Sequence, residues 1–132
     1  MKRLFLFCIL CLVFFQLKAQ TPAAKTGPYI KFAERMHEFP DIYEGDSLKH
    51  VFKFVNQGTA PLVLSDVITT CHCTTPAWTK EPILPGASGE IKVVFDSKGK
   101  PGIQNKVITV LSNATNSPER ISMRVNVLPK KQ

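Results

Sequence analysis

Two cysteines and a histidine near the middle of the chain are the residues best suited to chemistry. Cys71, His72 and Cys73 are consecutive, and each side chain can bind a metal ion. Two thiolates suit Cu(I), and two thiolates with an imidazole suit Zn(II). Cys71 and Cys73 could instead form a disulfide or act as redox thiols. Three kinds of chemistry are therefore open at this place, and all depend on how the backbone runs there.

A disulfide between Cys71 and Cys73 requires a bent backbone. In an extended strand, residues two apart have Cα atoms about 6.6 Å apart, whereas disulfides prefer a Cα separation of about 5.5–6 Å. The ring that this bond closes is small, so it gains little chain entropy. We expect either a local disulfide clip or two partly buried thiols.

A metal site at Cys71, His72 and Cys73 needs the same bend, because the side chain of His72 points away from its neighbours in an extended segment. His37 and His50 could add ligands, but each lies beside aromatic residues in an expected strand, which favours histidines packed within a sandwich. Redox catalysis would lack the helix N-terminus that usually lowers the pKa of a reactive thiol. We expect no cofactor, with copper or zinc as the alternative.

The start of the chain has the pattern of a secretory signal peptide. Lys2 and Arg3 precede an apolar stretch over residues 4–15, and Ala19 provides a small residue for cleavage. The apolar stretch has about 12 residues, whereas about 20 are needed to cross a bilayer. We therefore expect residues 1–19 to be removed and the protein to be exported, to the periplasm or the cell exterior, with no membrane span after cleavage.

Removal of residues 1–19 changes the charge and the cysteine content. The whole chain has a formal charge of +7, and the removed segment holds three basic residues and no acid, which leaves +4. The remaining basic residues are scattered, which argues against nucleic-acid binding. Cys8 and Cys11 leave with the segment, so Cys71 and Cys73 remain. Outside the cytoplasm, thiols usually become disulfides or metal ligands.

Alternating apolar residues predict a β-protein, and no segment has a convincing helical period. The expected strands cover residues 29–33, 36–39, 48–56, 61–68, 89–95, 106–112 and 120–128. Short strands separated by turn signals indicate an all-β fold, an antiparallel β-sandwich of about seven strands. The expected core includes Phe52, Phe54, Ile91, Val93, Phe95, Val125 and Val127.

One domain accounts for most of the chain. We expect a flexible leader over residues 20–28, the β-sandwich domain over residues 29–128 and a short tail over residues 129–132. Within the domain, residues 71–85 contain three prolines, which restrict φ and remove N–H donors. This stretch should be an ordered excursion between two strands, with both cysteines at one end of the sandwich and Trp78 covering the adjoining edge of the core.

Two stretches carry a family resemblance. Residues 52–58 (FKFVNQG), followed by Pro61-Leu62, resemble the strand and turn of hydin-type (ASH) and major-sperm-protein-like immunoglobulin domains. The Cys-x-Cys-Thr-Thr-Pro stretch and the glycines after it resemble a bacterial domain of unknown function, number fifteen-seventy-three, frequent in exported proteins of Bacteroidetes. The resemblance covers residues 36–127 and implies an immunoglobulin-like sandwich outside the cytoplasm, with no reaction attached. The family usually has glycine where this chain has His72.

These observations favour a non-catalytic module over an enzyme. Residues 86–89 lack the glycine spacing and following helix of a nucleophile elbow, and no helix follows residues 99–102 to bind phosphate. We expect no catalytic residues and a binding or structural role in the bacterial cell envelope, with a protein or glycan partner. The alternative is a small thiol redox or metal-binding protein that uses Cys71 and Cys73.

Overall fold

Nine strands and no helix make up residues 25–132, the part of the chain that the computed structural model describes. The strands are β1 (Ile30–Phe32), β2 (Met36–Glu38), β3 (Ile42–Tyr43), β4 (Ser47–Asn56), β5 (Leu64–Thr69), β6 (Thr74–Trp78), β7 (Ser88–Asp96), β8 (Gly102–Ser112) and β9 (Glu119–Leu128). The expected signal peptide, with Cys8 and Cys11, lies outside the described residues. Within residues 25–132, no helix is long and apolar enough to span a bilayer.

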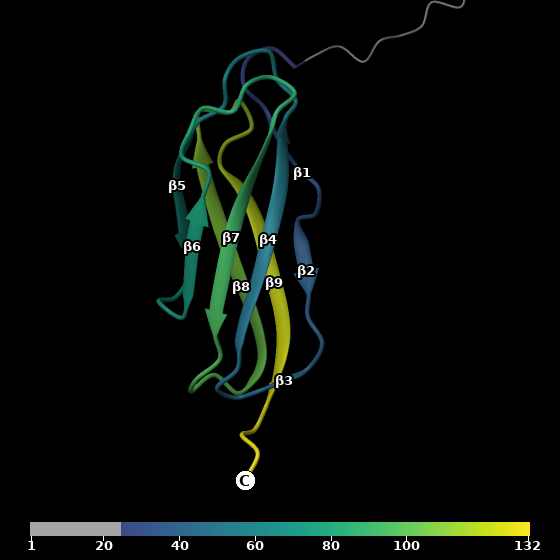
Figure 1. The fold of residues 1–132 in the computed structure, drawn as a ribbon, viewed down its shortest axis with the longest axis vertical. Coiled ribbons are helices and arrows are strands. Elements are labelled where there is room, and N and C mark those ends of the chain that lie inside the picture. The colour runs from purple at the N-terminus through teal and green to yellow at the C-terminus, as the bar shows by residue number, and fades with distance from the viewer. Residues whose placement is uncertain (1–24) are drawn as a thin grey trace, which may run out of the picture.

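The strands form two sheets that face each other (Figure 1). One sheet has the order β1-β4-β7-β6, and the other has the order β2-β9-β8-β5, with β3 also paired to β9. In the first sheet the register places Phe52 opposite Ile91, so apolar side chains of neighbouring strands meet on one face. All seven core residues expected from the alternation are buried. The all-β, immunoglobulin-like sandwich is therefore confirmed.

The strand inventory differs from the sequence prediction in two ways. Two strands were not predicted: β3 has only two residues, too few to show alternation, and β6 lies within the proline-rich excursion. The pairing was also predicted to be antiparallel throughout, but β2 and β3 run parallel to β9. Their direction follows from the chain path, because the chain leaves β1 and joins the opposite sheet instead of turning back on its own sheet.

Two chain crossings between the sheets position the side chains discussed below. Residues 33–35 lead from β1 to β2, which are edge strands of the two sheets on one side of the sandwich. Residues 70–73 lead from β5 to β6, the edge strands on the other side. Figure 1 shows these pairs on opposite sides of the molecule. Each open side of the sandwich is thus bridged by a short segment of chain.

Candidate functional site

The two cysteines lie in the crossing between β5 and β6, where a disulfide joins them. Their Cα atoms are 5.3 Å apart, closer than in an extended strand. The backbone supplies the required bend by a tight turn, in which the N–H of Thr74 donates to the carbonyl oxygen of Cys71 at 3.2 Å. The turn thus brings the two sulfur atoms together across one residue, His72.

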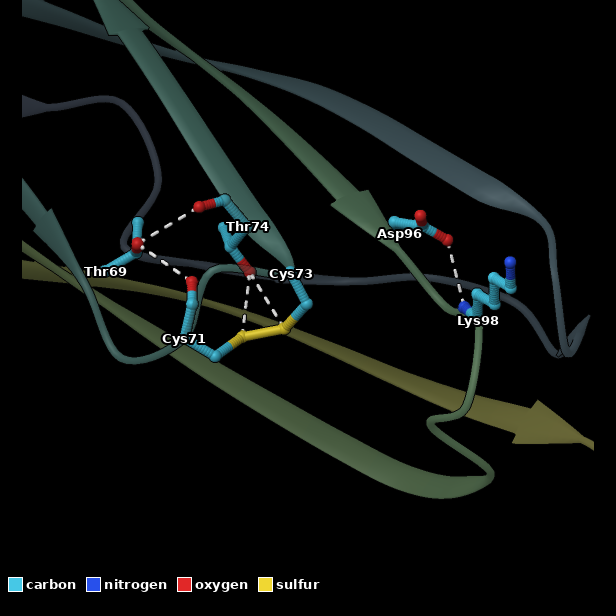
Figure 2. The surroundings of a disulfide bond; sticks show 6 residues. All are labelled: Thr69, Cys71, Cys73, Thr74, Asp96 and Lys98. Carbon is cyan, nitrogen blue, oxygen red and sulfur yellow. Dashed lines mark hydrogen bonds between the residues drawn. A yellow bond between two sulfur atoms is a disulfide. The ribbon is translucent and has the colours of Figure 1, made fainter.

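Hydrogen bonds fix this turn to the strands around it (Figure 2). The hydroxyl of Thr69 donates to the carbonyl oxygens of Cys71 and Thr74 at 3.2 and 3.1 Å. The buried hydroxyl of Thr74 lies 3.7 and 3.9 Å from the two sulfur atoms. The N–H of Asp96, at the end of β7, donates to the carbonyl oxygen of Cys73 at 2.9 Å. The turn is therefore anchored to β5, β6 and β7.

The disulfide limits what Cys71, His72 and Cys73 can do. Sulfur atoms bonded to each other provide no thiolate, which is the form that binds copper or zinc. Metal binding at these three residues would require prior reduction. Both cysteines are half-buried and His72 is exposed, so a reductant in solution can reach this turn. In the bonded state the arrangement acts as a covalent clip.

The proline-rich stretch after the cysteines was predicted to be an ordered excursion between two strands, and within it residues 74–78 form β6. This strand is at the edge of its sheet and pairs only with β7. An edge strand tolerates Pro76 because half of its N–H groups have no ladder partner. Trp78 packs against the hydrophobic core, as expected from its large apolar surface. The excursion is therefore ordered, as predicted, and includes an additional edge strand.

A hollow of about 260 Å³ lies at the end of β6. It is lined by Ala77, Trp78, Thr79, Lys80, Glu81, Glu90 and Lys92. The Nζ atom of Lys80 lies 3.1 Å from the centroid of the Trp78 ring, in a cation–π contact. Within residues 25–132, the buried Nε1 of Trp78 has no hydrogen-bond partner. The hollow thus combines an aromatic ring, two ammonium groups and two carboxylates.

A third cluster was not predicted from the sequence. His37 and His50 pack among aromatic rings as expected: the ring of His37 is 4.5 Å from that of Phe39, and the ring of His50 is 4.7 Å from that of Phe52, between centroids. Both imidazoles also donate to the carboxylate of Glu34. No periodicity reveals this convergence, because Glu34 lies in the crossing between the sheets rather than in a strand.

The histidines change the acidity of Glu34. Burial raises the pKa of this carboxyl, but hydrogen bonds from His50 and His37, together with their charge, outweigh burial and hold the pKa below its usual value. The carboxylate is therefore the form present near neutral pH. It faces two imidazoles, a set of groups that can also bind a metal ion.

Sequence comparison identifies a family but no characterised relative. The model of the family described as "Protein of unknown function (DUF1573)" matches residues 30–127. Comparison with curated protein sequences finds no match. The matched range contains all nine strands except the last residue of β9.

Solved structures share the fold at low sequence identity. A protein of unknown function from Porphyromonas gingivalis W83 has a TM-score of 0.67 at 21% identity, over 84% of this chain and 51% of that one. The ASH/PapD-like domain 7 of human CEP192 has a TM-score of 0.62 at 9% identity, over 77% and 87%. The secreted serine protease VesC from Vibrio cholerae has a TM-score of 0.57 at 12% identity, over 75% and 23%. This chain thus spans about half of the Porphyromonas gingivalis protein.

Proposed function

Because the chain belongs to the DUF1573 family of proteins of unknown function and folds as an immunoglobulin-like sandwich, we propose that it is an exported, non-catalytic module that binds a protein or glycan of the bacterial cell envelope. The amino-terminal pattern supports export to the periplasm or the cell exterior. The resemblance to a part of VesC, which is a secreted protease, agrees with a fold that works as a module in exported proteins.

The observation that carries this proposal is the hollow beside Trp78. A buried indole N–H normally has a hydrogen-bond partner, and that of Trp78 has none within residues 25–132. Lys80 and Lys92 supply donors, Glu81 and Glu90 supply acceptors, and the indole ring supplies an apolar surface. Glycans and polar protein surfaces present the complementary groups. A bound partner would displace the ammonium of Lys80 from the ring that it now covers.

Side chains rather than main-chain pairing should recognise the partner. The hollow adjoins the free edge of β6, and a free edge can accept a strand from another chain. However, β6 has only five residues and includes Pro76, which has no N–H to donate. A strand of the partner would therefore form few hydrogen bonds here, so the hollow is the better binding surface.

Charge reversal in the hollow should abolish partner binding. The mature protein, immobilised, is exposed to envelope extract and to a panel of glycans, and captured molecules are identified by mass spectrometry. We expect Lys80→Glu with Lys92→Glu to lose the partner captured by the wild type. The matched control is Lys98→Glu with Lys100→Glu, the same charge change in the exposed β7–β8 loop, which should retain it.

Two outcomes of this capture experiment would contradict the proposal. One is a partner that the hollow variant still binds, and the other is a partner that the hollow and loop variants lose equally. Thermal unfolding of each variant separates lost binding from lost fold. The ion pair between Lys92 and Glu90 is exposed, so its loss should cost little stability.

The second candidate function is thiol redox or metal handling at Cys71 and Cys73, which the half-exposed disulfide favours. If the disulfide is instead a structural clip, Cys71→Ser with Cys73→Ser should lower the free energy of unfolding by about 1–2 kcal/mol, as for closing a very small loop. Partner capture should be unchanged. Denaturant unfolding and the capture assay measure both. Thiol-dependent redox activity or Cu(I) binding that disappears in this variant would favour the second function.

A further inference from the structure

Glu34, His37 and His50 come from three different parts of the fold. Glu34 lies in the crossing between β1 and β2, His37 lies in β2, and His50 lies in β4 of the other sheet. The carboxylate accepts from both imidazoles: Oε1 is 2.5 Å from Nε2 of His50, and Oε2 is 3.3 Å from Nδ1 of His37. One potential ligand atom from each residue lies within 4.8 Å of the others.

We propose that Glu34, His37 and His50 form a binding site for a divalent transition-metal ion, with Zn²⁺ the best fit. Two imidazoles and one carboxylate are a ligand set that holds zinc in proteins, with a fourth position left for water. The set contains no thiolate, so it does not favour Cu(I). The site uses neither the disulfide nor the hollow beside Trp78, and it therefore extends beyond the proposed partner binding.

The distances are close to those that zinc requires. Ligand atoms lie about 2.0–2.2 Å from the ion, which places atoms of a tetrahedral set about 3.4 Å apart. The contact between Glu34 and His37 already has nearly this length, at 3.3 Å, whereas that between Glu34 and His50 is shorter, at 2.5 Å. The protons on Nδ1 of His37 and Nε2 of His50 that now face the carboxylate would move to the other nitrogen of each ring or to solvent when the ion binds. Zinc uptake also requires side-chain shifts of about an ångström, because the contact between Glu34 and His50 must lengthen from 2.5 Å to about 3.4 Å.

One imidazole must turn when the ion binds. The rings of His37 and His50 are stacked, with centroids 3.6 Å apart and planes 17° apart. The nitrogen lone pair of an imidazole lies in the plane of its ring. Two nearly parallel, stacked rings therefore cannot both direct a lone pair at the same ion. His50 is the more buried ring, with 17% of its side chain exposed, and it packs against Phe52, whereas 30% of the His37 side chain is exposed. We therefore expect His37 to rotate and the stack to open.

The location of the cluster gives the ion access and a structural effect. Because 40% of the Glu34 side chain is exposed, an ion can bind directly from solution. Zinc bound there would connect β2 and β4, which belong to different sheets. An ion that binds only the folded state stabilises it, so zinc should raise the temperature of unfolding.

Calorimetric titration of the metal-free mature protein, without an affinity tag, with ZnCl₂ tests this site. We expect one zinc ion per chain. Glu34→Gln and His37→Asn should each weaken binding at least about tenfold, the loss seen even for outer-shell partners of zinc ligands. His72→Asn is the matched control, since His72 is an exposed histidine outside the cluster, and it should bind zinc as the wild type does. Cys71→Ser with Cys73→Ser should also retain zinc.

Nuclear magnetic resonance distinguishes this site from zinc on the surface. The ring protons of His37 and His50 should shift together on zinc addition as the stack opens, while those of His72 stay unchanged. The proposal is overturned if the wild type binds no zinc at millimolar concentration. It is equally overturned if His72→Asn or the double serine variant loses zinc while His37→Asn and Glu34→Gln retain it. Melting curves of every variant in chelator report whether its fold is intact.

Discussion

Replacing Phe54 by alanine should lower the free energy of unfolding by about 3–5 kcal/mol, the usual cost of truncating a large aromatic side chain in a core. Phe54 is 1% exposed and packs edge-to-face on Phe32, with ring centroids 5.6 Å apart. Gly89 lies directly beneath its ring, because a Cβ atom there would come within 2.5 Å of Cζ of Phe54. The glycine has no side chain to fill the cavity left by the truncation.

Urea unfolding followed by circular dichroism measures this effect. Val51→Ala is the matched control, since Val51 lies in the same strand but is 37% exposed. Surface substitutions usually change stability by less than about 0.5 kcal/mol, so the control should remain near the wild type. A cost below about 1 kcal/mol for Phe54→Ala would place Phe54 outside the core that the alternation predicts.

Replacing Asn56 by leucine should cost about 3–4 kcal/mol, because each buried group left without a partner costs about 1–3 kcal/mol. The side chain of Asn56 is fully buried. Its Oδ1 accepts from the N–H groups of Tyr29 and Gly58 at 3.2 and 3.0 Å. Its Nδ2 donates to the carbonyl oxygens of Ala60 and Ile83 at 2.8 and 2.9 Å. Leucine has a similar volume but satisfies none of these groups.

The control for this substitution is Asn105→Leu. Asn105 is an exposed asparagine of β8, within the segment that pairs with β9. It should change stability by less than about 0.5 kcal/mol. Chemical denaturation of both variants in parallel gives the difference directly. Equal effects of the two substitutions would mean that the network around Asn56 contributes nothing beyond the loss of one amide group.

Alternation and turn signals predicted seven of the nine strands in the described part of the chain. In β4, β7 and β9 alternate residues form a mainly apolar face, and burial of that face confirms the pattern. β3 and the parallel pairing to β9 could not be predicted, because they depend on which sheet the chain joins after β1. β6 was not predicted because residues 71–85 were expected to form an excursion between strands. The prolines do exclude a central strand, and β6 is an edge strand.

The candidate sites were predictable where their residues are neighbours in sequence. Cys71 and Cys73 lie two apart, so the need for a bend between them followed from bond geometry alone. The alternation in β4 correctly placed His50 on the same face as Phe52. The alternation did not predict that the carboxylate of Glu34 contacts His50. Glu34 lies in the segment that crosses between the two sheets, and the position of that segment depends on the chain path.

The two crossings between the sheets have a consequence for how copies of the molecule meet. A strand with free N–H and C=O groups is a template for another copy, and repeated pairing of this kind leads to fibrils. Here all five edge strands are short, with three residues in β1 and β2, two in β3, six in β5 and five in β6. On each side the backbone turns out of one edge strand into the other. Resistance to aggregation is therefore built into the path of the chain, so it should persist at high salt, where repulsion between like charges is screened.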